Sequence, residues 1–70
     1  MQMKFKVKNY SNERLVKELQ EAKMRLSGYL QARKFIPASS ILGSLSVSYG
    51  IKYESSLIAA LEEEIQSRGL

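Results

Sequence analysis

The stretch from Leu45 to Tyr53 constrains the fold most, because apolar and polar side chains alternate there without interruption. Five apolar residues take the odd positions, and serine, glycine and lysine take the even ones. A period of two is typical of a strand that buries one face, and valine, isoleucine and tyrosine favour a pleated surface. We therefore predict a short β element at about residues 44–53, with Gly50 either inside a strand or at the turn of a tight hairpin.

A helix is the alternative for the same stretch. Ile41, Leu45 and Tyr49 are spaced so that they would share one face of a helix. Serine side chains, however, compete with the helical backbone, and a glycine costs about 1 kcal/mol in a helix interior. These propensities favour the strand.

A second alternation occupies the N-terminus, where apolar residues alternate with a glutamine and three lysines. It predicts a strand at residues 2–8, or a flexible arm, because chain ends are ordered only when something ties them down. The lysines at positions 4, 6 and 8 have two interpretations. They guard the edge of a sheet against aggregation, or they contact phosphates.

An amphipathic pattern predicts a long helix at about residues 12–32, with a cap at Ser11 or Asn12. Pro37 ends the helical region, because the residue before a proline is pushed toward extended backbone. The apolar stripe has the spacing of a coiled-coil seam, and it either packs into the core or meets a partner helix. The stripe consists of Leu15, Leu19, Ala22, Leu26 and Tyr29.

A second apolar stripe predicts a helix at about residues 55–68, which Gly69 ends. Glu64 and Arg68 are spaced to form an ion pair on it. The expected fold class is α+β, with two amphipathic helices packed on the short β element in a single domain of residues 1–70. The stripe consists of Leu57, Ile58, Leu61 and Ile65.

The charges divide unequally between the two halves of the chain. Residues 1–34 carry nine basic and three acidic side chains, whereas residues 35–70 carry two basic and four acidic ones. This polarity suits contact with nucleic acid, and equally suits head-to-tail packing of identical subunits. The candidate nucleic-acid contacts are Lys4, Lys6, Lys8, Lys23, Arg25, Arg33 and Lys34. The candidate interface residues are Glu62, Glu63, Glu64 and Tyr10. The alternative for the three glutamates is that they form a solvent-exposed face of the helix.

The residue types present predict a protein that is not an enzyme. The chain has no histidine and no cysteine, which removes the commonest general base, the commonest metal ligand and thiolate chemistry. Three consecutive glutamates fan around a helix and do not converge, and no glycine-rich phosphate loop is present. We expect no cofactor, no metal and no small-molecule substrate.

The longest apolar run has five residues, whereas a membrane span needs about 20. The N-terminus also lacks the apolar region of a signal peptide. We therefore expect no membrane association and a cytoplasmic location in a host cell.

Two segments resemble the phage head–tail joining proteins of the gpW type. The sequence from Ala22 to Phe35, with its basic pair Arg33-Lys34, resembles the end of that family's first helix and the entry into its hairpin. The sequence from Ser46 to Leu57 resembles the hairpin and the start of the second helix. The resemblance covers about residues 13–66. It implies an α+β ring subunit of the virion, which lies between portal and tail and helps to retain packaged DNA.

Two other functions compete with this one. A dimeric regulator of ribbon-helix-helix type would place Lys4, Lys6 and Lys8 in the major groove of DNA, and it would require Leu45–Tyr53 to be helical. The second is a small phage- or plasmid-encoded inhibitor that binds a host protein through the apolar seam of either helix.

Overall fold

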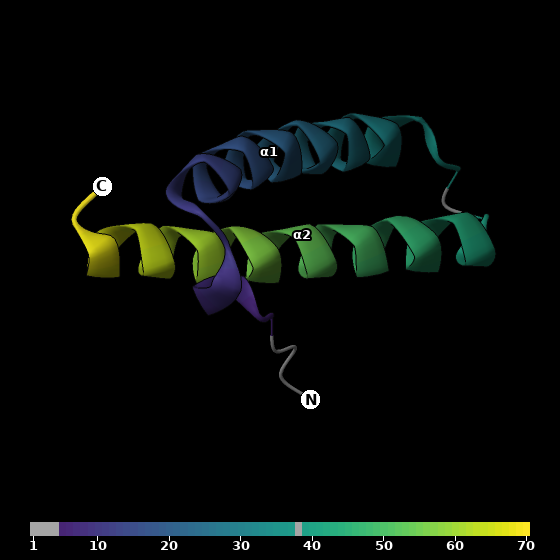
Figure 1. The fold of residues 1–70 in the computed structure, drawn as a ribbon. Helices are drawn as coiled ribbons and strands as arrows, with labels where there is room; N and C mark the ends of the chain where they lie inside the picture. Colours follow the sequence, from purple (N-terminus) through teal and green to yellow (C-terminus); the bar gives the residue numbers. More distant parts are fainter. Residues whose placement is uncertain (1–4, 38) are drawn as a thin grey trace.

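The protein is an antiparallel pair of long helices in the computed structural model, which describes residues 5–37 and 39–70 (Figure 1). A single 3-10 turn, η1 (Val7–Asn9), is followed by α1 (Asn12–Phe35) and α2 (Ile41–Arg68). The described residues contain no strand. The predicted α+β class is therefore wrong, and this part of the chain is an all-α helical hairpin.

The ends of the two helices follow the local signals in the sequence. Helix α1 begins at the predicted residue, where the Ser11 hydroxyl accepts a hydrogen bond of 3.1 Å from the amide of Arg14. It continues to Phe35, past the predicted end at residue 32, and stops where Pro37 holds the preceding residue in extended backbone. Helix α2 ends at Arg68, as predicted, and Gly69 takes the left-handed conformation, with φ of 72°.

The predicted β element at residues 44–53 is part of α2. The alternating apolar residues do not all lie on one buried face. In the helix they lie on two different faces, one exposed and one partly buried. Leu45 and Tyr49 point to solvent, whereas Val47 and Ile51 are half-buried. Alternation of apolar and polar residues is therefore compatible with a helix when the rest of the protein covers only part of that helix.

Gly50 lies where the two helices approach closely, and not in a strand or at a hairpin turn. A Cβ atom at this position would lie only 2.6 Å from Cε1 and Cζ of Tyr29. The missing side chain thus admits the tyrosine ring between the helices. This packing against α1 offsets the propensity cost that favoured a strand in the sequence.

The N-terminal segment packs across α2 near the open end of the hairpin (Figure 1). Residues 2–4 of the predicted strand lie outside the described residues. Residues 7–9 form a 3-10 turn, so this part of the predicted strand is wrong. Val7 is buried, because the turn directs its side chain into the core.

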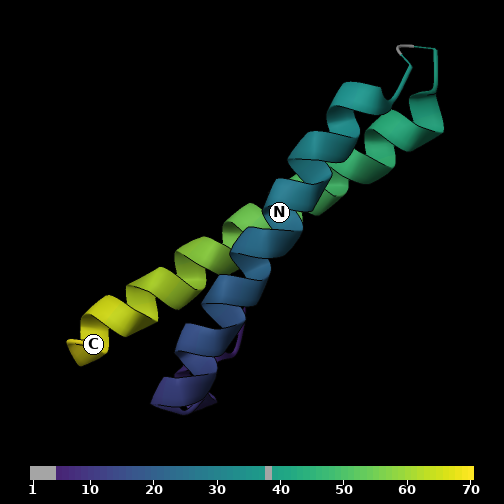
Figure 2. The ribbon, with the colours of Figure 1, turned by 90° about the horizontal axis from the view of Figure 1, so that it is seen from above.

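The core occupies the half of the hairpin near its open end. Leu15 and Leu61 are fully buried there. Leu19 and Ile65 are half-buried around them, which confirms much of the predicted stripes as core. The buried apolar residues are Val7, Leu15, Ala22, Leu57 and Leu61. Since η1 contributes to this half alone, the loop end consists of two helices without a third layer (Figures 1 and 2).

Candidate docking surface

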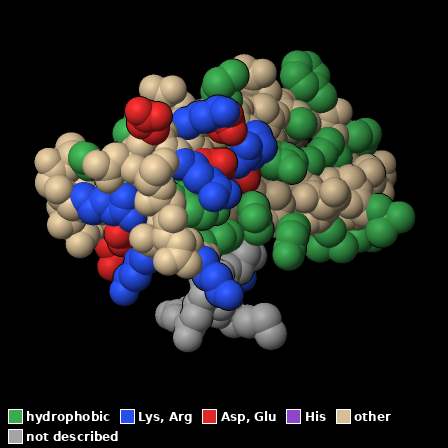
Figure 3. All heavy atoms as spheres, in the orientation of Figure 1, with side chains coloured by type: hydrophobic (Ala, Val, Ile, Leu, Met, Phe, Trp, Pro, Cys, Tyr) green, Lys and Arg blue, Asp and Glu red, His purple; other side chains and the backbone are tan. Residues whose placement is uncertain are grey.

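Large apolar side chains are exposed mainly at the loop end of the hairpin. This end carries seven of the eleven such residues in the described chain. Between residues 27 and 51, only Arg33 and Lys34 are charged. Figure 3 shows charged side chains over the open half and apolar side chains over the loop half. We call the seven residues the loop-end surface: Tyr29, Leu30, Phe35, Ile41, Leu42, Leu45 and Tyr49.

Three residues of the loop-end surface form a line along α2, which we call the α2 stripe: Leu42, Leu45 and Tyr49. Their spacing of three and four residues places them on one helical face. Their exposed fractions are 83%, 62% and 66%, values expected for surface lysines and not for leucines. The serines between them are exposed, and no charged residue of α2 precedes Lys52. A partner surface could therefore cover the stripe without removing a charge from water.

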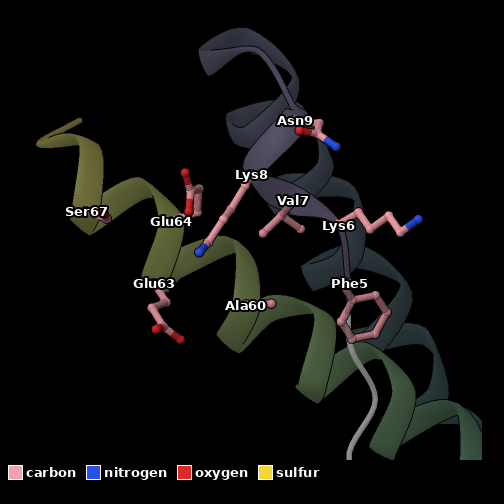
Figure 4. Close-up of a pocket in the computed structure, with 9 residues that line it drawn as sticks. All are labelled: Phe5, Lys6, Val7, Lys8, Asn9, Ala60, Glu63, Glu64 and Ser67. Atoms are coloured by element: carbon pink, nitrogen blue, oxygen red, sulfur yellow. The ribbon is translucent and has the colours of Figure 1, made fainter.

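Farther along α2, the N-terminal segment of the same chain covers the same face. The spacing places Tyr53 and Ala60 in line with the α2 stripe. The ring of Phe5 meets that of Tyr53 edge to face, with centroids 5.4 Å apart. Figure 4 shows Phe5, Val7 and Lys8 beside this part of α2. One helical face is thus covered near the open end and bare at the loop end.

A groove of about 710 Å³ lies between the N-terminal segment and α2 (Figure 4). Its lining combines the apolar residues Phe5 and Val7 with lysines and glutamates. Within the described ranges, no three acidic, histidine or cysteine side chains come together in a way that could hold a metal ion.

The predicted nucleic-acid contacts do not form one patch. Lys4 lies outside the described residues. Lys6 and Lys8 are exposed on the N-terminal segment. The pair Arg33 and Lys34 is exposed at the loop end, at the opposite end of a molecule whose longest dimension is 45 Å. The remaining two candidates, Lys23 and Arg25, lie on α1 between these ends.

Arg25 pairs with an acid within the chain. Its Nε donates to Oε2 of Glu54 over 2.7 Å, and this links α1 to α2. Glu54 is only 2% exposed, so Arg25 takes the place of water around its carboxylate. The hydrogen bond from Arg25 to Glu54 raises the pKa of Arg25 above its ordinary value. Because this pKa is raised in the folded state, the stability gained is fully present below the ordinary pKa of arginine and is lost only in stronger alkali.

We expect Arg25→Met to lower the free energy of unfolding by about 2–4 kcal/mol, because it leaves a buried carboxylate without its partner. Lys23→Met, which removes an exposed charge of the same sign from the same helix, should change it by less than about 0.5 kcal/mol. Adding Glu54→Met to Arg25→Met should recover part of the loss. Urea unfolding followed by circular dichroism measures all three. Equal effects of the two single variants would show that the pair is not structural.

The predicted interface residues are only partly free. Glu62 and Glu63 are exposed, but Glu64 accepts a hydrogen bond of 3.0 Å from Nε of Arg68, which confirms the predicted pair. Tyr10, a predicted interface residue, is half-buried against the core. The guanidinium of Arg14 lies over its ring, 3.8 Å from the centroid.

Sequence reasoning missed the second role of Arg68. Its guanidinium also donates to Oδ1 of Asn12 and to the backbone oxygen of Lys8, each over 2.9 Å. One side chain thus links the end of α2 to the start of α1 and to the N-terminal segment. These contacts join residues 56 and 60 positions apart, so no local pattern could have indicated them.

Comparisons with protein families, with curated proteins and with solved structures find no significant match. Neither of the two long helices is apolar enough over a sufficient length to cross a membrane. The functional inference for this chain therefore depends on its own surface.

Proposed function

We propose that the protein is a non-catalytic assembly protein that joins protein surfaces, and that identical copies of it associate as part of that role. The loop-end surface is the docking site in this proposal. The observation that supports it is the collection of exposed apolar side chains at one end of the hairpin, next to only two charges. Contiguous exposed apolar surface of this kind is typical of interaction sites.

The small size of the core also supports association. Only five apolar residues of the described chain are buried. Chains of about 70 residues rarely obtain more than about 3–5 kcal/mol from one core, and many use disulfides, metals or oligomerisation in addition. This chain has no cysteine for a disulfide, so association is the route that its composition favours.

The particular setting that we propose is the joint between head and tail of a phage particle, assembled in the cytoplasm of the host. The resemblance to gpW-type proteins suggests this setting. The resemblance assigns Ser46–Tyr53 to a β-hairpin, but this segment is helical. The fold of the chain therefore does not support the proposal. What supports it is the combination of an apolar docking surface with a chain that has neither histidine nor cysteine.

Photo-crosslinking in the cells that naturally make the protein tests the docking role. A benzophenone amino acid at position 42, within the loop-end surface, should give discrete protein adducts. The same group at Gln20, which is exposed on α1 in the open half, serves as the matched control and should give few. Mass spectrometry identifies the adducts. Equal, weak labelling at both positions would contradict the proposal.

The ribbon-helix-helix regulator is a second candidate, favoured by one observation. It required a helix at Leu45–Tyr53, and α2 covers these residues. It also required an N-terminal strand, whereas Val7–Asn9 is a 3-10 turn. Under this candidate, Lys6→Gln with Lys8→Gln should raise the dissociation constant for duplex DNA at least about tenfold and lessen its salt dependence. Unchanged affinity across a salt titration would reject it.

A further inference from the structure

We infer that the α2 stripe pairs with the α2 stripe of a second copy of this chain, antiparallel and about a two-fold axis. This inference rests on the proposed function and names the partner of the docking surface. In the pairing, Leu45 of one copy lies beside Tyr49 of the partner subunit, and the converse contact follows from symmetry.

The size of the exposed surface matches what a dimer needs. The most exposed members of the loop-end surface are Phe35, Ile41 and the three residues of the stripe, between 62% and 83% exposed. Together these side chains present on the order of 800 Å² of mainly apolar surface, of which the α2 stripe supplies somewhat more than half, and a stable protein interface buries roughly 800 Å² per partner. Two hairpins joined in this way would form a four-helix arrangement with the core layer that the loop end lacks.

The chemistry of the stripe is self-complementary. An isologous interface brings the same patch of both copies together, so any charge in the patch would meet its own like charge. The α2 stripe avoids this conflict, because the residues from 41 to 51 carry no charge. Ser46, which flanks the stripe on the helix surface, is small and exposed, and therefore allows two helices to approach closely.

The position of the N-terminal segment determines the orientation. This segment occupies the same face of α2 beyond Tyr53, where Phe5 packs on that residue. In a parallel dimer, the two N-terminal segments would lie at the same end and collide. In an antiparallel dimer centred near residue 47, they lie at opposite ends. The bare part of the face then meets only the bare part of the partner subunit.

The mass of the purified protein in solution tests the pairing directly. Sedimentation equilibrium should give about twice the chain mass of 8.0 kDa. Leu45→Asp should raise the dimer dissociation constant at least about 100-fold, because it places two like charges in the interface. Met24→Asp, at an exposed apolar residue of α1 outside the loop-end surface, should leave it unchanged. Tyr49→Lys repeats the test if Leu45→Asp disturbs the circular dichroism spectrum.

Spin-label distances test the orientation, and the absence of cysteine means that one introduced cysteine carries one label. With a rise of 1.5 Å per residue, labels at position 66 should lie more than about 45 Å apart in the antiparallel dimer, and labels at position 46 within about 25 Å. A short distance at position 66 would overturn the orientation.

A monomeric parent at about 100 μM would overturn the pairing, as would a Leu45→Asp variant that dimerises like the parent. A monomer that binds vesicles of anionic lipid would assign the surface to a membrane instead. Crosslinks from position 42 to a different protein only would overturn this inference but support the docking role. The pairing and the docking role therefore fail separately, whereas a monomeric parent would also overturn the association of identical copies.

Discussion

Leu61→Ala is expected to lower the free energy of unfolding by about 2–5 kcal/mol, enough to unfold much of the protein at 25 °C. Leu61 is fully buried in the cluster that joins α2 to α1 and η1. Truncation would remove the apolar contacts of three methyl-sized groups and leave a cavity that two rigid helices cannot close. Urea unfolding, followed by circular dichroism at 222 nm, measures the loss.

Met24→Ala is the matched control for this experiment. Met24 is also a large apolar residue in a helix, but it is 73% exposed and lies on α1. Its truncation should change the free energy of unfolding by less than about 0.5 kcal/mol. If the two variants lost the same stability, the core would not lie near the open end of the hairpin.

The second large effect concerns the segment for which the sequence predicted a strand. Ser48→Pro should destabilise the protein by about 3 kcal/mol or more, because proline removes a hydrogen bond and clashes with the preceding helical turn. Ser48 is exposed, so no lost packing contributes. Ser48→Ala should instead raise stability by up to about 0.5 kcal/mol, since alanine is the better helix former.

The pair of substitutions at position 48 distinguishes the helix from the strand. In a strand, alanine is unfavourable relative to serine or neutral, and an edge position tolerates proline. A parent-like melting temperature for Ser48→Pro would therefore contradict a helix through this segment. The two variants should be compared at one protein concentration, because association through the nearby stripe would also affect stability.

Local signals in the sequence were sufficient to locate the start of α1 and the end of α2, the two helix ends at which a capping residue acts. Ser11 caps α1 at the predicted residue, and Gly69 ends α2 as its lack of a side chain suggested. Each of these features depends on a few neighbouring residues and on hydrogen bonds within one turn. Nothing distant in the chain is required, so the sequence could specify them.

The prediction was wrong at residues 44–53 because it weighed local propensity without tertiary contacts. The serines and Gly50 disfavour a helix when taken alone. Gly50 instead gives space to the ring of Tyr29, a residue 21 positions away. A helix of modest propensity is stabilised by the neighbour that it packs against, and that neighbour cannot be read from the segment itself.

The candidate sites show the same limit. Arg25 was counted among nucleic-acid contacts because its charge was visible in the sequence, whereas its buried partner Glu54 lies 29 residues away. Leu45 and Tyr49 were expected in the core of a sheet. Both residues are exposed, and this exposure supports the docking proposal. It has two causes: another face of α2 packs against α1, and the described part of the N-terminal segment does not extend along α2 as far as these residues.

The sequence by itself determined where α1 begins, where α2 ends, most of the residues of α1 that face inward, and the absence of histidine and cysteine, because these depend on residue type and short spacing. Only the tertiary structure decided that the segment after Ser40 joins α2, that Glu54 is buried against Arg25, and that one apolar face remains bare. Those outcomes depend on contacts between distant residues, whose energies exceed the propensity differences within any one segment.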